Sequence, residues 1–215
     1  MITILNKTIS LFIRLGLLYK RIVQRLPLTN VKKLIDYSYL RYYGVTVNYG
    51  KVELFGWPII QKAQGSSIIL EDGIILISSH KFNPAGMGHK AILATLSSDA
   101  SITIGKNSGL SGSSICSLES IIIGEHCNLG VASKIYDTDF HPVDPIERKE
   151  QKKMSDAKSS PVVLESNVWL GANSTILKGV TLKENTVVAV GAVVTKTFGD
   201  NLVLAGIPAK VIKQL

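Results

Sequence analysis

Large aliphatic residues recur every six positions in the C-terminal third of the chain. The residues at this spacing are Leu164, Leu170, Ile176, Leu182, Val188 and Val194. Four positions after each of the first five stands a small or β-branched residue, in the order Val168, Ser174, Val180, Thr186 and Ala192. A period of six matches neither the helical repeat of 3.6 residues nor the two-residue alternation of a long strand. It predicts short strands separated by tight corners, with three hexads closing one triangular coil.

The same spacing continues toward the N-terminus, with one change of register. The earlier residues are Ile123, Leu129 and Ile135 and, one residue out of register with them, Ile104, Leu110 and Cys116. Coils that stack in this way form a solenoid, in which each coil hydrogen-bonds to its neighbours. We therefore expect a mainly β protein, built as a parallel β-helix.

The pattern divides the chain into three regions. Residues 1–50 are expected to form a basic, amphipathic helical region, residues 51–200 the β-helix, and residues 201–215 a C-terminal tail. Two insertions, at 78–100 and 141–161, interrupt the hexads. Long loops inside a compact domain are usually functional or disordered, so both insertions are expected to be one or the other.

The net charge of +8 is concentrated at the N-terminus. Residues 1–51 hold nine Lys and Arg against a single acid, whereas the remainder holds fifteen of each sign. This basic helical region is expected either to contact an anionic membrane surface peripherally or to pack on the main domain or a second subunit. Lys7 and Arg14 interrupt its apolar stretch, so neither a secretory signal nor a transmembrane helix is expected. The protein is expected to be cytoplasmic, either free or at the inner face of the membrane.

Several classes of site find no support in the sequence. Cys116 and Cys127 lie in strand-like segments without metal-ligand spacing, so a reduced protein is expected. The four histidines also lack ligand spacing, and no metal site is expected. No nucleic-acid recognition motif accompanies the basic residues, and no nucleic-acid partner is expected.

The strongest chemical signal is the segment 137–142, which reads Asp-Thr-Asp-Phe-His-Pro. It ends a regular coil and opens the second insertion. Histidine is the side chain most often used as a general base near neutral pH, so His141 is the candidate base. Asp137 or Asp139 could orient its imidazole, or simply cap the loop.

The sequence resembles the hexapeptide-repeat acyltransferases, in particular sugar O-acetyltransferases of the galactoside, maltose and surface-polysaccharide type. The resemblance is carried by the Asp-Thr-Asp-Phe-His-Pro segment and by segments 168–173, 190–196 and 205–213. The resemblance implies a left-handed β-helix, with a right-handed one as the structural alternative, and acetyl-CoA as co-substrate without a metal. It also implies a homotrimer with active sites between subunits. The residues it assigns to CoA binding are Ala172, Val190, Thr195, Lys196, Lys210 and Lys213.

The resemblance favours acetyl transfer to a sugar hydroxyl, with His141 as general base and a sugar or glycolipid as acceptor, in surface polysaccharide or lipopolysaccharide synthesis. One departure concerns the acceptor: galactoside and maltose acetyltransferases use an upstream asparagine, whereas residues 110–115 here contain none. An N-acyltransferase acting on an amino sugar and a non-catalytic β-helix binding protein remain as alternatives.

Overall fold

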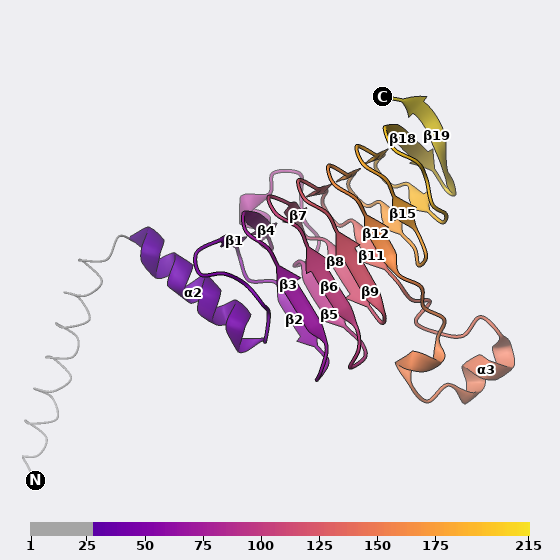
Figure 1. The fold of residues 1–215 in the computed structure, drawn as a ribbon, viewed down its shortest axis with the longest axis horizontal. Coiled ribbons are helices and arrows are strands. Elements are labelled where there is room, and N and C mark those ends of the chain that lie inside the picture. The colour runs from indigo at the N-terminus through magenta and orange to yellow at the C-terminus, as the bar shows by residue number, and fades with distance from the viewer. Residues whose placement is uncertain (1–27) are drawn as a thin grey trace, which may run out of the picture.

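The structure is a computed structural model that describes residues 28–215. Helix α2 (Leu28–Tyr42) leads into a prism whose three sides are formed by sheets of eight, six and five strands (Figure 1). The strands within each side pair in parallel, apart from the final hairpin. This arrangement confirms the expected parallel β-helix.

Successive strands visit the three sheets in turn. The eight-stranded sheet contains β1 (Val52–Phe55), β4 (Ile74–Ile77), β7 (Gly109–Ser111), β10 (Asn128–Leu129), β13 (Trp169–Leu170), β16 (Val187–Val188), β18 (Leu202–Gly206) and β19 (Ala209–Gln214). The six-stranded sheet contains β2 (Ile59–Lys62), β5 (Ile92–Thr95), β8 (Ser114–Ser117), β11 (Lys134–Tyr136), β14 (Thr175–Ile176) and β17 (Val193–Val194). The five-stranded sheet contains β3 (Ser67–Leu70), β6 (Ser101–Ile104), β9 (Ser120–Ile123), β12 (Val162–Leu164) and β15 (Thr181–Leu182).

The core consists of aliphatic side chains stacked from coil to coil. Leu164 pairs in register with Leu182, and both side chains are fully buried. All six residues of the hexad series that starts at Leu164 lie in this core, as do the five small or β-branched residues between them. Each large aliphatic side chain contributes about 1.5–3 kcal/mol by leaving water, so the six-residue spacing is the main sequence determinant of the fold.

The position expected for Cys116 is wrong by one residue. Ile115, and not Cys116, is fully buried and pairs with the core residue Ile135. The corner before it contains Gly112 at a φ of +57°, and Ile115 follows Leu110 after five positions instead of six. The chain therefore reaches the next core position one residue early, which places Cys116 on the other side of the strand.

The structure adds detail to two of the expected segments. Strand β5 lies inside the range 78–100 and pairs with β2 and β8, so the first insertion leaves the prism only over residues 78–91. The C-terminal tail, residues 201–215, joins the prism, because β18 pairs in parallel with β16 and antiparallel with β19. The chain thus ends in a hairpin that extends the eight-stranded sheet.

Helix α2 packs on the first coil of the prism. Leu40 is buried, and the Tyr39 hydroxyl donates to the carbonyl of Pro58 at 2.6 Å. The Tyr39 ring stacks on Trp57 with 4.9 Å between ring centroids. Packing on the main domain therefore holds for residues 28–42, while the earlier part of the basic, amphipathic region, residues 1–27, lies outside the described residues. None of the helices in the described part is long and apolar enough to span a membrane.

Candidate active site

The candidate base His141 stands at the start of the long loop between β11 and β12. Figure 1 shows this loop, with α3 (Pro145–Glu150), projecting from the side of the prism. Asp137, directly after β11, is fully buried. Its carboxylate accepts hydrogen bonds from the Ser117 hydroxyl at 2.8 Å and from the amides of Leu118 and Glu119 at 2.6 and 2.9 Å. The root of the loop is therefore anchored to the preceding coil.

The two ends of the loop also hold each other. Thr138 and Ser159 form an antiparallel bridge, and the amide of Asp139 donates to the carbonyl of Lys158 at 3.0 Å. The Asp139 carboxylate lies 2.9 Å from the ammonium of Lys178, which belongs to the next coil. The first residues of the loop are thus fixed on both sides.

Phe140 turns the chain immediately before His141. Its φ is +61°, in the left-handed region that a bulky side chain seldom occupies and that costs on the order of 1–3 kcal/mol. The amide of Phe140 donates to the Thr138 hydroxyl at 3.1 Å. Its ring packs edge-on against Tyr136, with 5.2 Å between centroids. These contacts hold the strained turn, and the side chain of His141 is exposed beyond it.

The short helix α3 follows from a local capping sequence. Asp144 is its N-cap and accepts from the amides of Ile146 and Glu147 at 2.8 and 3.0 Å, with Pro145 in the first turn. The hydrogen bond from the Glu147 amide, followed by that from Ile146, lowers the pKa of the Asp144 carboxyl. Arg148 donates to two carbonyls of the segment before the helix, at 3.0 and 2.7 Å. The chain is thereby folded back toward His141.

The imidazole of His141 contacts Gln151, the residue that follows α3. The distance between His141 Nδ1 and Gln151 Oε1 is 2.7 Å. Among the described residues, no hydrogen bond joins the imidazole to Asp137 or Asp139, whose carboxylates bind the groups named above. The orienting role considered for these two residues stays a prediction, and the contact seen in this chain comes from a residue that the sequence did not indicate.

Ala172 and Val190 lie on the corner between the eight- and six-stranded sheets. A Cβ atom at Gly171 would come within 2.6 Å of the amide nitrogen of Val190, so the close approach of two coils requires glycine there. The amide of Gly191 donates to the carbonyl of Ala172 at 2.9 Å. Within the described part of the chain, neither the amide of Ala172 nor that of Val190 donates to a backbone carbonyl.

The four other residues assigned to CoA binding are exposed. Thr195 and Lys196 follow β17, and the ammonium of Lys196 lies 5.5 Å from the centroid of the Phe198 ring. Lys210 and Lys213 lie on β19. Surface lysines on the last coil and the hairpin can act as point charges toward phosphate groups.

A single chain does not bring the candidate base and the Ala172 corner together. His141 leaves the prism between the six- and five-stranded sheets, because β11 belongs to the former and β12 to the latter. Ala172 and Val190 lie on a different corner, between the eight- and six-stranded sheets. Thr195 is on the same corner as His141, two coils further along.

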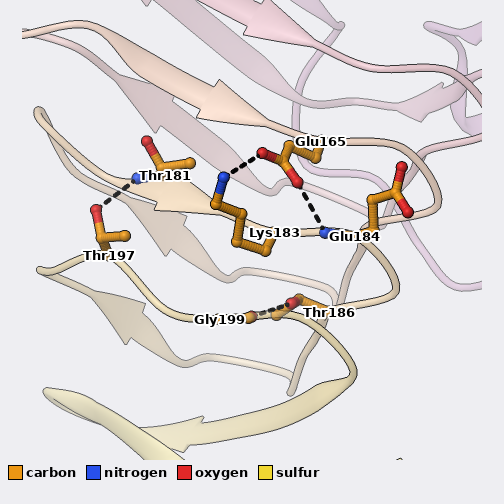
Figure 2. A network of polar contacts seen from close by, with 7 residues as sticks. All are labelled: Glu165, Thr181, Lys183, Glu184, Thr186, Thr197 and Gly199. Atoms are coloured by element: carbon orange, nitrogen blue, oxygen red, sulfur yellow. Dashed lines mark hydrogen bonds and ion pairs between the residues drawn. The ribbon is translucent and has the colours of Figure 1, made fainter.

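Polar contacts connect the last coils, as Figure 2 shows. The Lys183 ammonium lies 2.6 Å from the Glu165 carboxylate, which also accepts from the amide of Glu184 at 3.3 Å. The amide of Thr181 donates to the Thr197 hydroxyl at 3.0 Å. These bonds link successive coils in the part of the prism that carries the candidate CoA-binding residues.

The remaining histidines lie away from the loop between β11 and β12. His80 and His89 line a hollow of about 430 Å³ with Trp57 and Met87, under the first insertion. His126 occupies a corner at a φ of +57°. No group of three or more His, Cys, Asp or Glu side chains is placed to hold a metal ion in residues 28–215.

The two cysteines are poorly suited to nucleophilic catalysis. Burial raises the pKa of the Cys127 thiol. Burial, with a contribution from the charge of Asp137, raises the pKa of Cys116 to about 11. Both side chains are therefore thiols near neutral pH, and thiolate chemistry is not expected from either.

Comparison with known proteins agrees with the fold and with the motifs. Residues 161–196 match the hexapeptide repeat of succinyl-transferase. The chain is 38% identical over 106 residues to a putative lipopolysaccharide biosynthesis O-acetyl transferase, WbbJ, of Escherichia coli, covering 46% of this chain and 53% of that protein. The chain thus spans about half the length of this relative.

Two solved structures are similar over a larger part of the chain. The polysialic acid O-acetyltransferase OatWY has a TM-score of 0.56 and 26% identity, covering 79% of this chain and 84% of its own. A hexapeptide-repeat acetyltransferase of Vibrio cholerae complexed with acetyl coenzyme A has a TM-score of 0.51 and 26% identity, covering 59% of this chain and 69% of its own. The resemblance to hexapeptide-repeat acyltransferases is thereby confirmed, and with it the left-handed β-helix with an N-terminal helix.

Proposed function

We propose that this protein transfers an acetyl group from acetyl-CoA to a sugar hydroxyl, with His141 as general base. The observation that carries the proposal is the position of His141: an exposed imidazole on a strained turn whose root is held by buried hydrogen bonds. Rigid support of this kind is what a base needs to meet an acceptor hydroxyl at hydrogen-bond distance. The relatives that are O-acetyltransferases, and the relative that binds acetyl coenzyme A, support the choice of substrates.

The proposed reaction is a direct transfer in a ternary complex. His141 removes the proton from the hydroxyl while that oxygen attacks the thioester carbonyl. The amide of Ala172 stabilises the tetrahedral oxyanion, which then collapses and expels the CoA thiolate, and this takes up the proton. No covalent enzyme intermediate is needed, in keeping with the raised pKa values of both cysteines.

The donor site can be tested without knowing the acceptor. Calorimetric titration with acetyl-CoA is expected to show saturable binding in the range of about 10 µM to 1 mM, common for enzyme substrates. Replacing Lys210 and Lys213 by alanine together should weaken binding by about fivefold or more, since two charge-assisted phosphate contacts would be lost. Lys149→Ala, an exposed change on α3, is the matched control. No binding at several millimolar would refute the donor assignment.

We also propose that the active site is completed by a second copy of the chain in a homotrimer. Its support is the placement of His141 and Ala172 on different corners of one prism, which leaves neither corner with both halves of the site. Light scattering should give the mass of three chains of 23.3 kDa each. A monodisperse species of one chain that still turns over acetyl-CoA would contradict this arrangement.

The acceptor is proposed to be a saccharide of the cell surface, such as a polysaccharide, lipopolysaccharide or lipid-linked precursor. Support comes from two relatives: WbbJ is a putative lipopolysaccharide biosynthesis O-acetyl transferase, and OatWY is a polysialic acid O-acetyltransferase. A cytoplasmic protein at the inner face of the membrane would meet such precursors, and contact through residues 1–50 stays a prediction. An N-acyltransferase acting on an amino sugar is the alternative, since the same base would serve an amine. Comparing nitrophenyl hexosides with a nitrophenyl glucosaminide as acceptors separates the two.

A further inference from the structure

The side chain of Gln151, which contacts the imidazole of His141, is itself fixed by hydrogen bonds within the loop. Gln151 is held at three points: its Oε1 lies 2.7 Å from His141 Nδ1, and its Nε2 donates to the carbonyls of Phe140 and Lys153 at 3.0 and 3.1 Å. Of these partners, Phe140 precedes α3 in the sequence and Lys153 follows it. The carboxamide therefore spans the loop that it belongs to.

These partners determine which way round the carboxamide lies. Backbone carbonyls can only accept hydrogen bonds, so the atom that faces both of them must be the amide nitrogen. The atom that faces His141 is then the carbonyl oxygen, which likewise can only accept. For the contact with Gln151 to be a hydrogen bond, Nδ1 of the neutral imidazole must carry the proton.

We propose that Gln151 is a positioning residue that holds His141 in the Nδ1–H tautomer, leaving the lone pair of Nε2 free to accept the proton of the substrate hydroxyl. This inference rests on the proposed function for its catalytic consequence but not for the tautomer itself. The ring orientation follows from the same contact, because the carboxamide is anchored by two backbone carbonyls. A wrong tautomer in a comparable base lowers turnover severely, even when the geometry is intact.

The charged side chains near the imidazole of His141 are bound to other groups and do not orient it. The Asp139 carboxylate is paired with Lys178 at 2.9 Å, and that of Asp137 is buried among its own three donors. The guanidinium of Arg148 donates to backbone carbonyls. The group that orients the base in this chain is therefore a neutral amide, in contrast to the carboxylate of a serine-protease triad.

Nitrogen NMR of the protein labelled with 15N-histidine tests the tautomer directly. The chain has four histidines, and the signals of His141 are assigned by their loss in His141→Ala. At a pH where the ring is neutral, we expect Nδ1 to carry the proton and Nε2 to be unprotonated. Gln151→Met, similar in length but without the carboxamide, should shift the ring toward the Nε2–H form. Gln151→Glu should keep the Nδ1–H form, because a carboxylate can only accept.

Steady-state rates of CoA release, with nitrophenyl hexosides as acceptors, test the consequence for catalysis. Gln151→Met should lower kcat by about 10–100-fold, by analogy with the loss of the hydrogen-bond partner of a metal-bound histidine, while the KM for acetyl-CoA is unchanged. Gln151→Glu should recover part of the loss. Glu150→Gln, an exposed change at the neighbouring position, is the matched control and should alter neither the spectrum nor kcat.

Each outcome decides one of the two proposals. A wild-type ring in the Nε2–H form, or a Gln151→Met variant with an unchanged tautomer or an unchanged kcat, overturns the role of Gln151. If His141→Ala instead keeps full turnover, the proposed function fails, while the tautomer result stands by itself. A fall in stability alone, without a change of tautomer, would make Gln151 merely structural and also overturns the inference.

Discussion

Replacing His141 by alanine is expected to lower kcat by about 10²–10⁴-fold, the range associated with loss of a general base. The affinity for acetyl-CoA should stay nearly unchanged, because the residues proposed to bind the donor lie on other coils. The side chain is exposed, so its removal leaves no buried cavity and the fold should be retained. The measurement combines rates of CoA release with calorimetric titration of the same protein preparation.

His126→Asn is the matched control for this experiment. His126 also occupies a corner of the prism, at a φ of +57°. Asparagine stands at comparable positive φ values at residues 107, 167, 185 and 201, so the exchange should be tolerated. Equal turnover in His141→Ala and wild type would remove His141 from the mechanism, and equal losses in both variants would show that the effect is not specific.

Replacing Asp137 by alanine is expected to lower the free energy of unfolding by about 3 kcal/mol or more. The buried carboxylate accepts three hydrogen bonds, from Ser117, Leu118 and Glu119, and its loss would leave these donors without a partner. Each buried group left unpaired costs about 1–3 kcal/mol. Urea denaturation, followed by circular dichroism at fixed protein concentration, measures the change.

Asp139→Ala separates a structural from a catalytic role for the two acidic residues. Its partly exposed ion pair with Lys178 should be worth no more than about 1 kcal/mol. If Asp137→Ala kept full stability but lost turnover, Asp137 would orient the base, as the sequence allowed. Loss of stability in Asp137→Ala, with little change in Asp139→Ala, would establish Asp137 as the anchor of the loop.

The core could be predicted because one rule governs it. Every coil repeats the same requirement, an aliphatic side chain pointing inward once per side, so the spacing is visible along the chain. The prediction failed at Cys116, where the corner at Gly112 shortens one step to five residues. The prediction also placed β5, residues 92–95, inside an insertion. This strand is defined by its pairing with β2 and β8, which the six-residue spacing does not indicate. Such irregularities depend on contacts between coils that a periodic pattern does not contain.

The candidate site was predictable only where its residues lie close together in sequence. The segment 137–142 indicated His141 directly. Gln151 stands ten positions later within a run of charged residues, and nothing in that run sets it apart. Its contact with the imidazole depends on a helix of six residues that begins at the Asp144 cap and returns the chain to its starting point.

The sequence by itself determined the architecture of this protein, since burial of a six-residue aliphatic repeat admits few folds besides a triangular β-helix. It also determined the candidate base, through a local motif at the end of a coil. Only the tertiary structure decided what surrounds that base: the buried Asp137 anchors the loop, Gln151 contacts the imidazole, and the Ala172 corner lies on another edge of the prism. The physical reason is that periodic burial is a property of local sequence, whereas a site is assembled by loops and corners whose partners are distant along the chain.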